Sequence, residues 1–170
     1  LFEAFGRLVE SLDGRYITAM DSGTTTADMA NIARHTKHVS SKPSDGDPSP
    51  FTAEGIYLGL VAAVKHQLKR DSVEGLTVAI QGIGNVGFGL AKHLHQGGAK
   101  LIITDINNER VSQVADELEA TPCALEDIHR QDCDIFSPCA LGAVLNDQTI
   151  PEIKASIIAG GANNQLAENK

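Results

Sequence analysis

Residues 76–105 read LTVAIQGIGNVGFGLAKHLHQGGAKLIITD, and this stretch decides the fold. It begins with an apolar run typical of a buried strand, followed by three glycines with the spacing G-x-G-x-x-G. Apolar residues then recur at helical spacing until a Gly-Gly pair ends the pattern. A second apolar run ends at Asp105. The order strand, glycine turn, helix, strand predicts a parallel β-α-β unit.

Each glycine of the triplet has its own physical function in a loop that binds a dinucleotide. Gly82 permits the tight turn, Gly84 lets the backbone approach a pyrophosphate, and Gly87 lets the helix pack closely on its strand. Free N–H groups at the start of the helix, from Asn85 and Val86 onward, would face the phosphates. The alternative is a β–α turn that binds nothing, but the strand and helix around the triplet favour dinucleotide binding.

Asp105 ends the second strand about 20 residues after the first glycine, where a carboxylate accepts hydrogen bonds from the adenosine ribose. Its neighbour Ile106 is expected in the same cofactor loop. A 2′-phosphate would meet the negative charge of Asp105, and no basic residue is evident beside it, so the sequence favours NAD over NADP. The alternative function for Asp105 is that of a helix N-cap.

Composition and charge exclude several classes of protein. The chain has 170 residues, 42% of them hydrophobic, which suits one α/β domain and part of a second. The formal net charge is −8, and no Lys/Arg cluster is present, which argues against a nucleic-acid partner. No apolar run approaches the ~20 residues that span a bilayer, and the first residues lack the apolar core of a signal peptide, so we expect no membrane partner.

Cysteine and histidine usage predicts neither disulfides nor a metal site. The 3 cysteines form no C-x-x-C pair, and an odd number is a poor basis for a disulfide framework. A reducing cytoplasm is therefore the expected location. His35 and His38 could hold a metal at positions i and i+3, but no third ligand is apparent, and a surface helix end is the favoured interpretation.

The segments before residue 50 predict a small first domain. Residues 1–13 have the pattern of an amphipathic helix. Residues 15–19 are β-prone, which places Asp21 at the end of an expected strand, and a threonine among residues 24–26 is expected to cap a helix. The polar segment 40–50 contains three prolines, typical of a hinge, and we place a domain boundary there.

The remainder predicts a Rossmann-type doubly wound parallel sheet of the α/β class. A long helix is expected from Ser49-Pro50 to Leu68, because Ser suits the N-cap and Pro the first helical position. Further expected elements are a helix at 111–118, strands near 121–124, 133–136 and 157–159, a helical turn at 125–129, and a helix beginning at the C-terminal end. Ligand loops in such a sheet lie beyond the carboxyl ends of the strands, here at 82–87, 105–106, 138–142 and 160–164.

Several strings closely resemble one enzyme family, the amino-acid dehydrogenases that act on Glu, Leu, Phe and Val. They are GRYITAMDSGT at 14–24, PSPFTA at 48–53, QGIGNV at 81–86, TDIN at 104–107, CDIFSPCALG at 133–142 and ANNQL at 162–166. The resemblance is strongest to the members acting on leucine and covers nearly the whole chain. It implies NAD-dependent oxidative deamination of a branched-chain L-amino acid, leucine or valine, to the 2-oxo acid and ammonia.

The resemblance also implies functions for individual residues. Asp21 matches the catalytic aspartate that moves protons to and from the substrate nitrogen, although by itself it reads as a turn or cap residue. Ala19 matches a small residue of the substrate side-chain pocket. Thr52 matches a hydroxyl near the nicotinamide amide, and Asn163 an asparagine near the nicotinamide ribose; each could instead only satisfy local backbone groups.

Cys139 and Ala140 lie in the expected cofactor loop after a strand. Because no His-plus-acid arrangement supports Cys139 as a nucleophile, a packing thiol is the favoured interpretation. The sequence does not separate leucine from valine as the substrate. The two differ by one methylene, which changes the binding free energy in an apolar pocket by only about 1–3 kcal/mol.

The ends of the sequence depart from the family pattern. The glycine-rich segment with two lysines, which the family uses to anchor the substrate carboxylate and to activate water, is not found in these residues. We therefore expect a fragment, with residues 1–47 as the C-terminal part of the substrate domain and its hinge, and 48–170 as a C-terminally truncated NAD domain. Alone, it should bind NAD without turnover, while the full-length protein should be a homo-oligomer. The alternative is a nucleotide-binding module without chemistry.

Overall fold

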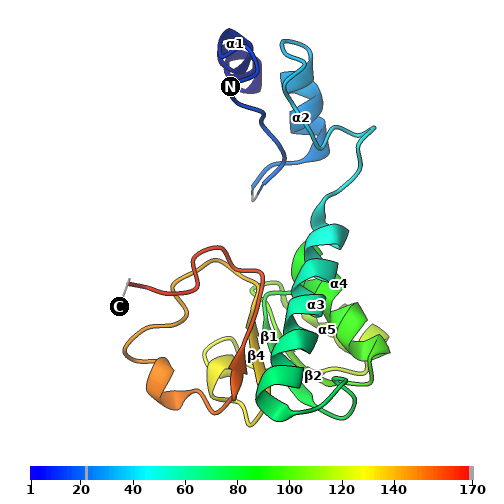
Figure 1. Ribbon diagram of the computed structural model, residues 1–170, viewed down its shortest axis with the longest axis vertical. Coiled ribbons are helices and arrows are strands. Elements are labelled where there is room, and N and C mark those ends of the chain that lie inside the picture. The colour runs from blue at the N-terminus through cyan, green and yellow to red at the C-terminus, as the bar shows by residue number, and fades with distance from the viewer. Residues whose placement is uncertain (22, 169–170) are drawn as a thin grey trace. The chain divides into compact units, whose positions relative to one another are not determined.

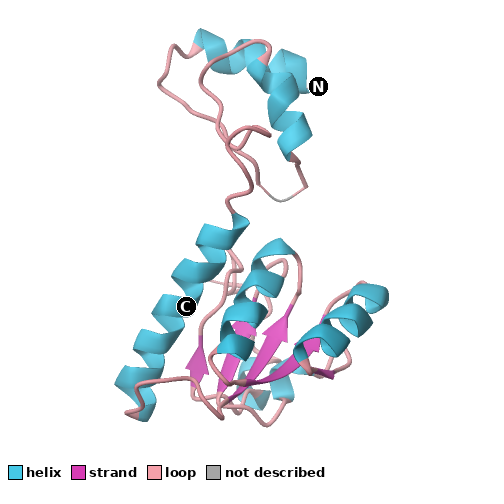
Figure 2. Cartoon of the chain, turned by 90° about the vertical axis from the view of Figure 1, so that its right-hand side faces the viewer, coloured by secondary structure: helices cyan, strands magenta, loops and turns pink. Residues whose placement is uncertain are grey.

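The computed structural model describes residues 1–21 and 23–168, and the chain forms two compact units, Leu1–Pro48 and Ser49–Lys170 (Figures 1 and 2). The division falls one residue after the boundary expected between 47 and 48. The assignment of the two units to substrate and cofactor binding stays a prediction.

The first unit is a pair of helices, α1 (Phe2–Ser11) and α2 (Thr26–Ala33). Their apolar sides enclose a small core of Met29, Ile32 and Val39, against which the phenylalanines of α1 pack. The expected threonine cap is Thr25, whose Oγ1 accepts from the N–H of Asp28 at 3.3 Å while the carboxylate of Asp28 accepts from the N–H of Thr25 at 2.8 Å. This reciprocal capping box fixes the start of α2.

The strand expected at residues 15–19 is wrong. Only Thr18 pairs, in an isolated parallel bridge with Val39: its N–H donates to His38 O at 3.1 Å, and its carbonyl accepts from the N–H of Ser40 at 2.8 Å. β-prone side chains make a strand only where a neighbouring segment offers a ladder of partners, and here the neighbour offers one residue pair.

The second unit is built on a five-stranded parallel sheet with the order β3-β2-β1-β4-β5. The strands are β1 (Thr77–Gln81), β2 (Lys100–Thr104), β3 (Thr121–Pro122), β4 (Ile135–Pro138) and β5 (Ile157–Ile158). The chain moves outward from β1 to β3, then returns to the other side of β1 for β4 and β5. This confirms the doubly wound α/β class, whose switch point lies between β1 and β4.

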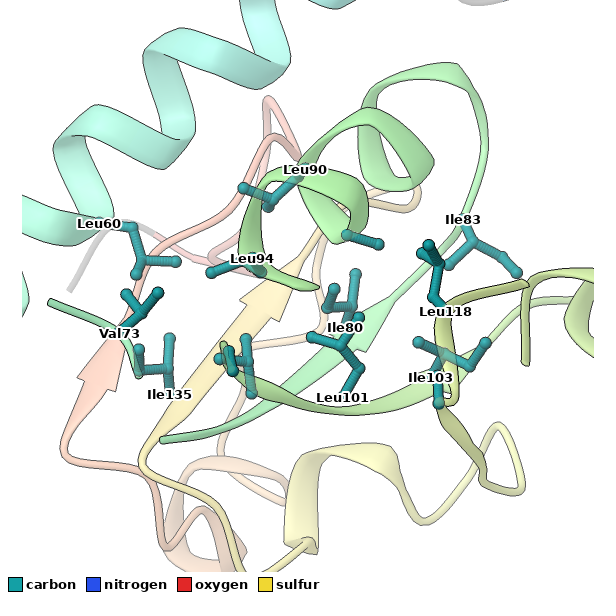
Figure 3. Packing of buried hydrophobic residues seen from close by; sticks show 14 of the residues in the cluster. Leu60, Val73, Ile80, Ile83, Leu90, Leu94, Leu101, Ile103, Leu118 and Ile135 are labelled. Carbon is teal, nitrogen blue, oxygen red and sulfur yellow. The ribbon is translucent and has the colours of Figure 1, made fainter. Parts of the chain in front are cut away.

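Three helices, α3 (Ser49–Leu68), α4 (Asn85–Gln96) and α5 (Asn108–Leu118), cover one face of the sheet. Leu60 of α3 and Leu90 and Leu94 of α4 pack over Ile80 of β1 and Ile135 of β4 (Figure 3). The expected helical periodicities are therefore confirmed, because the residues at that spacing are the buried ones.

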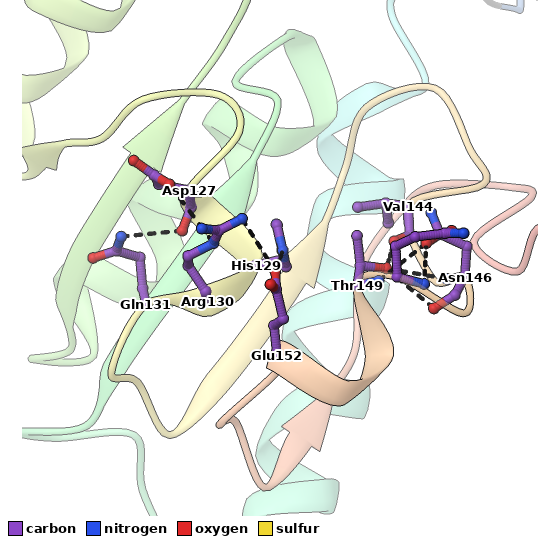
Figure 4. Close-up of polar contacts among 9 residues, drawn as sticks. Asp127, His129, Arg130, Gln131, Val144, Asn146, Thr149 and Glu152 are labelled. Carbon is purple, nitrogen blue, oxygen red and sulfur yellow. Dashed lines mark hydrogen bonds and ion pairs between the residues drawn. The ribbon is translucent and has the colours of Figure 1, made fainter.

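The opposite face carries two short 3₁₀ helices, η1 (Ile128–Arg130) and η2 (Ile150–Glu152). A smaller core of Ala79, Ile128, Phe136 and Leu145 lies under them. Next to it, polar side chains of η1 and η2 bind one another (Figure 4). No helix in the described part of the chain is both long and apolar enough to cross a membrane.

Two expected elements begin two or three residues later than predicted. The strand expected at 133–136 runs over 135–138, since the carboxylate of Asp134 accepts from the N–H of Thr77 at 2.8 Å before the ladder begins. The helical turn expected at 125–129 lies at 128–130.

The helix expected at the C-terminal end is wrong for residues 165–168. Leu166 instead forms an isolated parallel bridge with Leu145, whose N–H donates to Gln165 O at 2.9 Å and whose carbonyl accepts from Ala167 N at 3.0 Å. Residues 169 and 170 lie outside the described residues.

Candidate functional site

The carboxyl ends of β1, β2 and β4 surround one cavity of about 400 Å³. It lies at the switch point of the sheet, where open α/β sheets bind ligands. Its lining consists of Gln81, Gly82, Gly84, Asp105, Ile106, Leu125, Cys139, Ala140 and Leu141. Six of the residues expected at a cofactor site are thereby brought together: Gly82, Gly84, Asp105, Ile106, Cys139 and Ala140.

The glycine loop is crowded on its protein side and open on its cavity side. Gly82 has φ +89°, and a Cβ there would stand 2.8 Å from Ala140 N. A Cβ on Gly87 would stand 2.0 Å from Gly82 O, so only glycine lets α4 lie against the turn. A Cβ on Gly84 would meet no atom of residues 1–21 and 23–168 within 4 Å. The space before Gly84 is therefore available to a ligand.

The start of α4 points its backbone at this space. Gly84 is the N-cap and offers no side-chain cap, and the first bond within the helix runs from Phe88 N to Gly84 O at 2.9 Å. The N–H groups of the first turn are not used by the helix itself, and the helix dipole favours negative charge there. Asn85 is exposed and Val86 is half-buried at this position.

Asp105 holds the glycine loop from the end of β2. Its Oδ2 accepts from Ile83 N at 2.8 Å, and its Oδ1 accepts from Asn107 N at 3.0 Å. The N-cap of α5 is Asn107, whose Oδ1 accepts from Arg110 N at 3.1 Å. The alternative of Asp105 as a helix cap is therefore wrong, because the third residue of the loop, not the first, occupies the cap position.

A basic residue stands beside this loop, contrary to expectation. Arg110, in the first turn of α5, donates from Nε to the carbonyl of Ile83, the residue whose N–H binds Asp105. Nothing in the local sequence indicates that Arg110, five residues after Asp105, contacts the glycine loop. The contact depends on how α5 packs beside the loop.

Gln81 and Leu125 also line the cavity, although the sequence analysis did not single them out as site residues. Gln81 Oε1 is buried and has no hydrogen-bond partner among the described residues, so it is an acceptor facing the ligand side of β1 without a donor. Ile106 and Leu141 are 87% and 86% exposed, and Leu125 is 43% exposed. Such exposed apolar side chains around a cavity are typical of a site that covers a flat ring.

Cys139 is a packing thiol at the floor of the cavity. Its Sγ accepts from Gly161 N at 3.4 Å and lies 3.6 Å from Ser137 Oγ. Burial raises the pKa of Cys139, which keeps the thiol protonated and unreactive at neutral pH. Ala140 closes the cavity against Gly82.

The other expected site residues do not line the cavity. Thr52 is exposed in the first turn of α3, and Asn163 is exposed in the loop after β5. Ala19 and Asp21 are exposed and belong to the first unit. Asp21 begins a turn rather than ending a strand, because Thr24 N donates to Asp21 O at 3.0 Å and Thr24 Oγ1 accepts from Asp21 N at 2.9 Å.

The parallel sheet with a glycine turn and cavity at its switch point defines the class as a Rossmann-type α/β protein. Residues 50–108 match the family model described as Glutamate/Leucine/Phenylalanine/Valine dehydrogenase. The resemblance to this family that the sequence showed is thereby confirmed.

Named relatives agree with this family. The chain is 53% identical over 172 residues to the leucine dehydrogenase of Geobacillus stearothermophilus, covering 99% of this chain and 47% of the relative. It is 43% identical over 167 residues to the L-tryptophan dehydrogenase of Nostoc punctiforme, covering 98% of this chain and 47% of the relative. The chain spans about half the length of the curated relatives it matches.

Solved structures share the fold. The crystal structure of the Nostoc punctiforme L-tryptophan dehydrogenase has a TM-score of 0.82 at 42% identity, covering 100% of this chain and 49% of that one. A hetero-hexameric glutamate dehydrogenase from Thermus thermophilus has a TM-score of 0.73 at 19% identity, covering 96% and 46%.

Proposed function

We propose that this chain carries the cofactor domain and part of the substrate domain of an NAD-dependent amino-acid dehydrogenase. The proposed reaction is oxidative deamination of a branched-chain L-amino acid, leucine or valine, to the 2-oxo acid and ammonia. The observation that carries the proposal is the open space before Gly84 at the start of α4, in a chain 53% identical to a leucine dehydrogenase.

The residues around the cavity fit a nicotinamide dinucleotide. The first turn of α4 would bind the pyrophosphate through N–H groups, and Asp105 would accept from the ribose hydroxyls. Ile106, Leu125 and Leu141 would cover the faces of a base. The bound nicotinamide supplies a hydride acceptor, while the protein positions it and excludes water.

The proton chemistry is assigned to the chain's own residues. Asp21 would accept and return a proton at the substrate nitrogen, and Ala19 would leave room for the substrate side chain. Thr52 and Asn163 would orient the nicotinamide amide and its ribose. These four assignments follow the family resemblance, and each stays a proposal.

The nucleotide site is tested with Gly84→Val in the 170-residue chain. Because the added side chain projects into open space, circular dichroism should show a folded protein. Calorimetric titration of the same sample should show loss of NAD binding, since valine fills the place of the pyrophosphate. A variant that keeps its NAD affinity would mean that the loop does not hold phosphate.

The preference for NAD is tested by titrating the unaltered chain with NAD and with NADP. NAD should bind more tightly, because the 2′-phosphate of NADP meets the charge of Asp105. Equal or tighter NADP binding contradicts the preference.

The catalytic assignment needs a longer polypeptide that adds the family's lysine segment to these residues. There Asp21→Asn keeps the shape but removes the basic carboxylate, so the turnover number should fall by about 10²–10⁴-fold. NADH absorbance with leucine, valine and glutamate provides the measurement, and NAD affinity serves as the control. Normal turnover in the variant would return Asp21 to the function of a turn residue.

We also propose that the complete enzyme is a homo-oligomer. The glutamate dehydrogenase from Thermus thermophilus that shares the fold is described as hetero-hexameric, so assembly occurs on related scaffolds. Sedimentation equilibrium of the longer polypeptide tests this, and a monomer would contradict it.

A further inference from the structure

Arg110 carries a charge that the described part of the protein leaves without a counterion. Its side chain is half-buried, and Nε donates to Ile83 O. Within residues 1–21 and 23–168, no carboxylate forms an ion pair with Arg110, and its two terminal amino groups make no hydrogen bond. Guanidinium groups in partly buried positions are usually matched by a carboxylate or phosphate.

Another arginine in the same unit shows the contrast. Arg130 Nη2 lies 3.1 Å from Glu152 Oε2, and Arg130 Nε lies 3.6 Å from Asp127 Oδ1, so carboxylates of the protein balance the charge of Arg130. Arg110 instead places two terminal amino groups, to which no described residue hydrogen-bonds, at the loop that borders the 400 Å³ cavity. An anionic ligand group is the partner that this arrangement favours.

Arg110 and Asp105 hold the same residue from its two polar ends. Asp105 Oδ2 accepts from the N–H of Ile83, and Arg110 Nε donates to its carbonyl. Ile83 lies between the first two glycines of the loop, so a negative and a positive side chain meet the loop within one residue of each other. A ligand group bound beside Asp105 is therefore also within the field of Arg110.

A neighbouring helix supports the guanidinium. Arg110 Cζ lies 5.8 Å from the ring centroid of Phe88 on α4, and Lys92 Nζ lies 4.6 Å from the same centroid. The ring restricts the side chain of Arg110 and so lowers the entropy that it loses on binding a ligand. Lys92 thus places a second positive charge against the same ring.

We propose that Arg110 is a specificity-determining residue that attracts a phosphate on the ribose 2′-oxygen, in opposition to Asp105. The inference rests on the proposed nucleotide site. The preference for NAD is then a balance between the opposed charges of Asp105 and Arg110, which both bind the backbone of Ile83. It is not the effect of one carboxylate alone. Removal of Asp105 alone should admit NADP, because the cation for the 2′-phosphate is already present.

Four versions of the 170-residue chain test the proposal: the unaltered chain, Asp105→Ser, Arg110→Gln and the double variant. Calorimetric titration gives the dissociation constants for NAD and NADP. Asp105→Ser should tighten NADP binding by about 10- to 100-fold relative to NAD, the range of a charged hydrogen bond. In the Arg110→Gln background the same change should shift the ratio by at least about threefold less, because only the repulsion by Asp105 is then removed and the cation is missing.

Two further variants separate charge from structure. Arg110→Lys on the Asp105→Ser background keeps the charge but loses the planar fork, so part of the NADP gain should remain. Arg70→Gln is the matched control: it removes an arginine that donates to Glu74 O, before β1 and away from the loop, and should leave the ratio unchanged. Circular dichroism and thermal melting establish that each variant is folded.

Two results would overturn the inference. If Arg110 only braces the loop, Arg110→Gln weakens NAD and NADP by the same factor, and the gain from Asp105→Ser survives in the double variant. If the unaltered chain and every variant bind neither nucleotide, the proposed function fails together with this inference. Tight NAD binding with an Arg110-independent ratio contradicts this inference alone.

Discussion

The two faces of the sheet in the second unit are stabilised in different ways. One face is covered by α3, α4 and α5 over a broad apolar core. The other is covered by η1, η2 and loops over a small core, and it adds a cluster of charged side chains. Apolar burial acts at every pH, whereas charged pairs depend on protonation. The second face should therefore be the pH-sensitive one.

The charged cluster joins the two 3₁₀ helices. His129 Nε2 lies 2.7 Å from Glu152 Oε2, and Arg130 Nη2 lies 3.1 Å from the same oxygen (Figure 4). Close by, Asn146 Oδ1 accepts from the N–H groups of Gln148 and Thr149, each at 3.0 Å. Short turns bury little apolar area, so polar contacts between them replace the packing that long helices provide.

The largest expected effect is on the helix-covered face, from Gly87→Ala. The new Cβ would stand 2.0 Å from Gly82 O, a backbone atom that cannot move without opening the turn. We expect a loss of at least about 4 kcal/mol in the free energy of unfolding, measured by urea denaturation. Gly59→Ala in α3 is the control: its Cβ would meet no described atom within 4 Å, and the substitution should stabilise the protein by about 0.5–1 kcal/mol. Equal stability of the two variants would contradict the close approach.

A matched pair of substitutions compares the two cores directly. Ile80 and Ile128 are both 0% exposed, but Ile80 lies under long helices and Ile128 on a single 3₁₀ turn. A substitution costs less stability where the surrounding residues can move into the space left behind. Ile80→Val should therefore lower the free energy of unfolding by about 1.5 kcal/mol and Ile128→Val by about 0.5 kcal/mol. Urea denaturation of both variants measures the difference. A larger loss for Ile128→Val than for Ile80→Val would contradict the view that the helix-covered face is rigid and the other face adaptable.

The smallest effect is the pH dependence of the second face. The hydrogen bond from His129, with the nearby Arg130, lowers the pKa of Glu152 from its ordinary value of 4.5. A lowered folded-state pKa gives stability that is present above the unfolded-state pKa and is lost as the pH falls through the folded-state value. Thermal midpoints recorded from about pH 6 to about pH 3 should therefore fall more steeply in the unaltered chain than in Glu152→Gln.

The control for this pH series is Glu117→Gln, which neutralises an exposed acid on α5 outside the cluster. Its midpoint should follow that of the unaltered chain across the pH range. Parallel curves for all three proteins would mean that the contact between η1 and η2 adds no pH-dependent stability.

Local signals predicted the parts of the fold in which neighbours along the chain meet. The helical spacing of Leu90 and Leu94 specifies a buried stripe within α4, and the glycine triplet specifies a turn whose backbone conformation other residues rarely adopt. Six expected cofactor residues meet at one cavity because parallel strands present their carboxyl ends on one edge. That edge follows from the parallel direction of the strands, which the alternation of helices and strands already implied.

Other predictions failed where a distant segment decides the outcome. Residues 15–19 have strand propensity but find a single partner residue, Val39. β4 begins two residues later than its apolar run because Asp134 binds the start of β1. The alternative of Asp105 as a helix cap also fails, since its carboxylate accepts from the N–H of Ile83. In each case a contact between separate segments outweighs a local preference.

The sequence by itself determined the β-α-β unit, its glycine turn and the acid at the end of β2, because these depend on backbone sterics and apolar spacing within a few residues. Only the tertiary structure decided that Arg110 reaches Ile83 across 27 positions, that Gln81 Oε1 finds no donor among the described residues and that Ala140 closes on Gly82. Those contacts depend on the side of β1 to which each crossover returns. Local preferences do not encode that choice, since it minimises the free energy of the whole packed sheet.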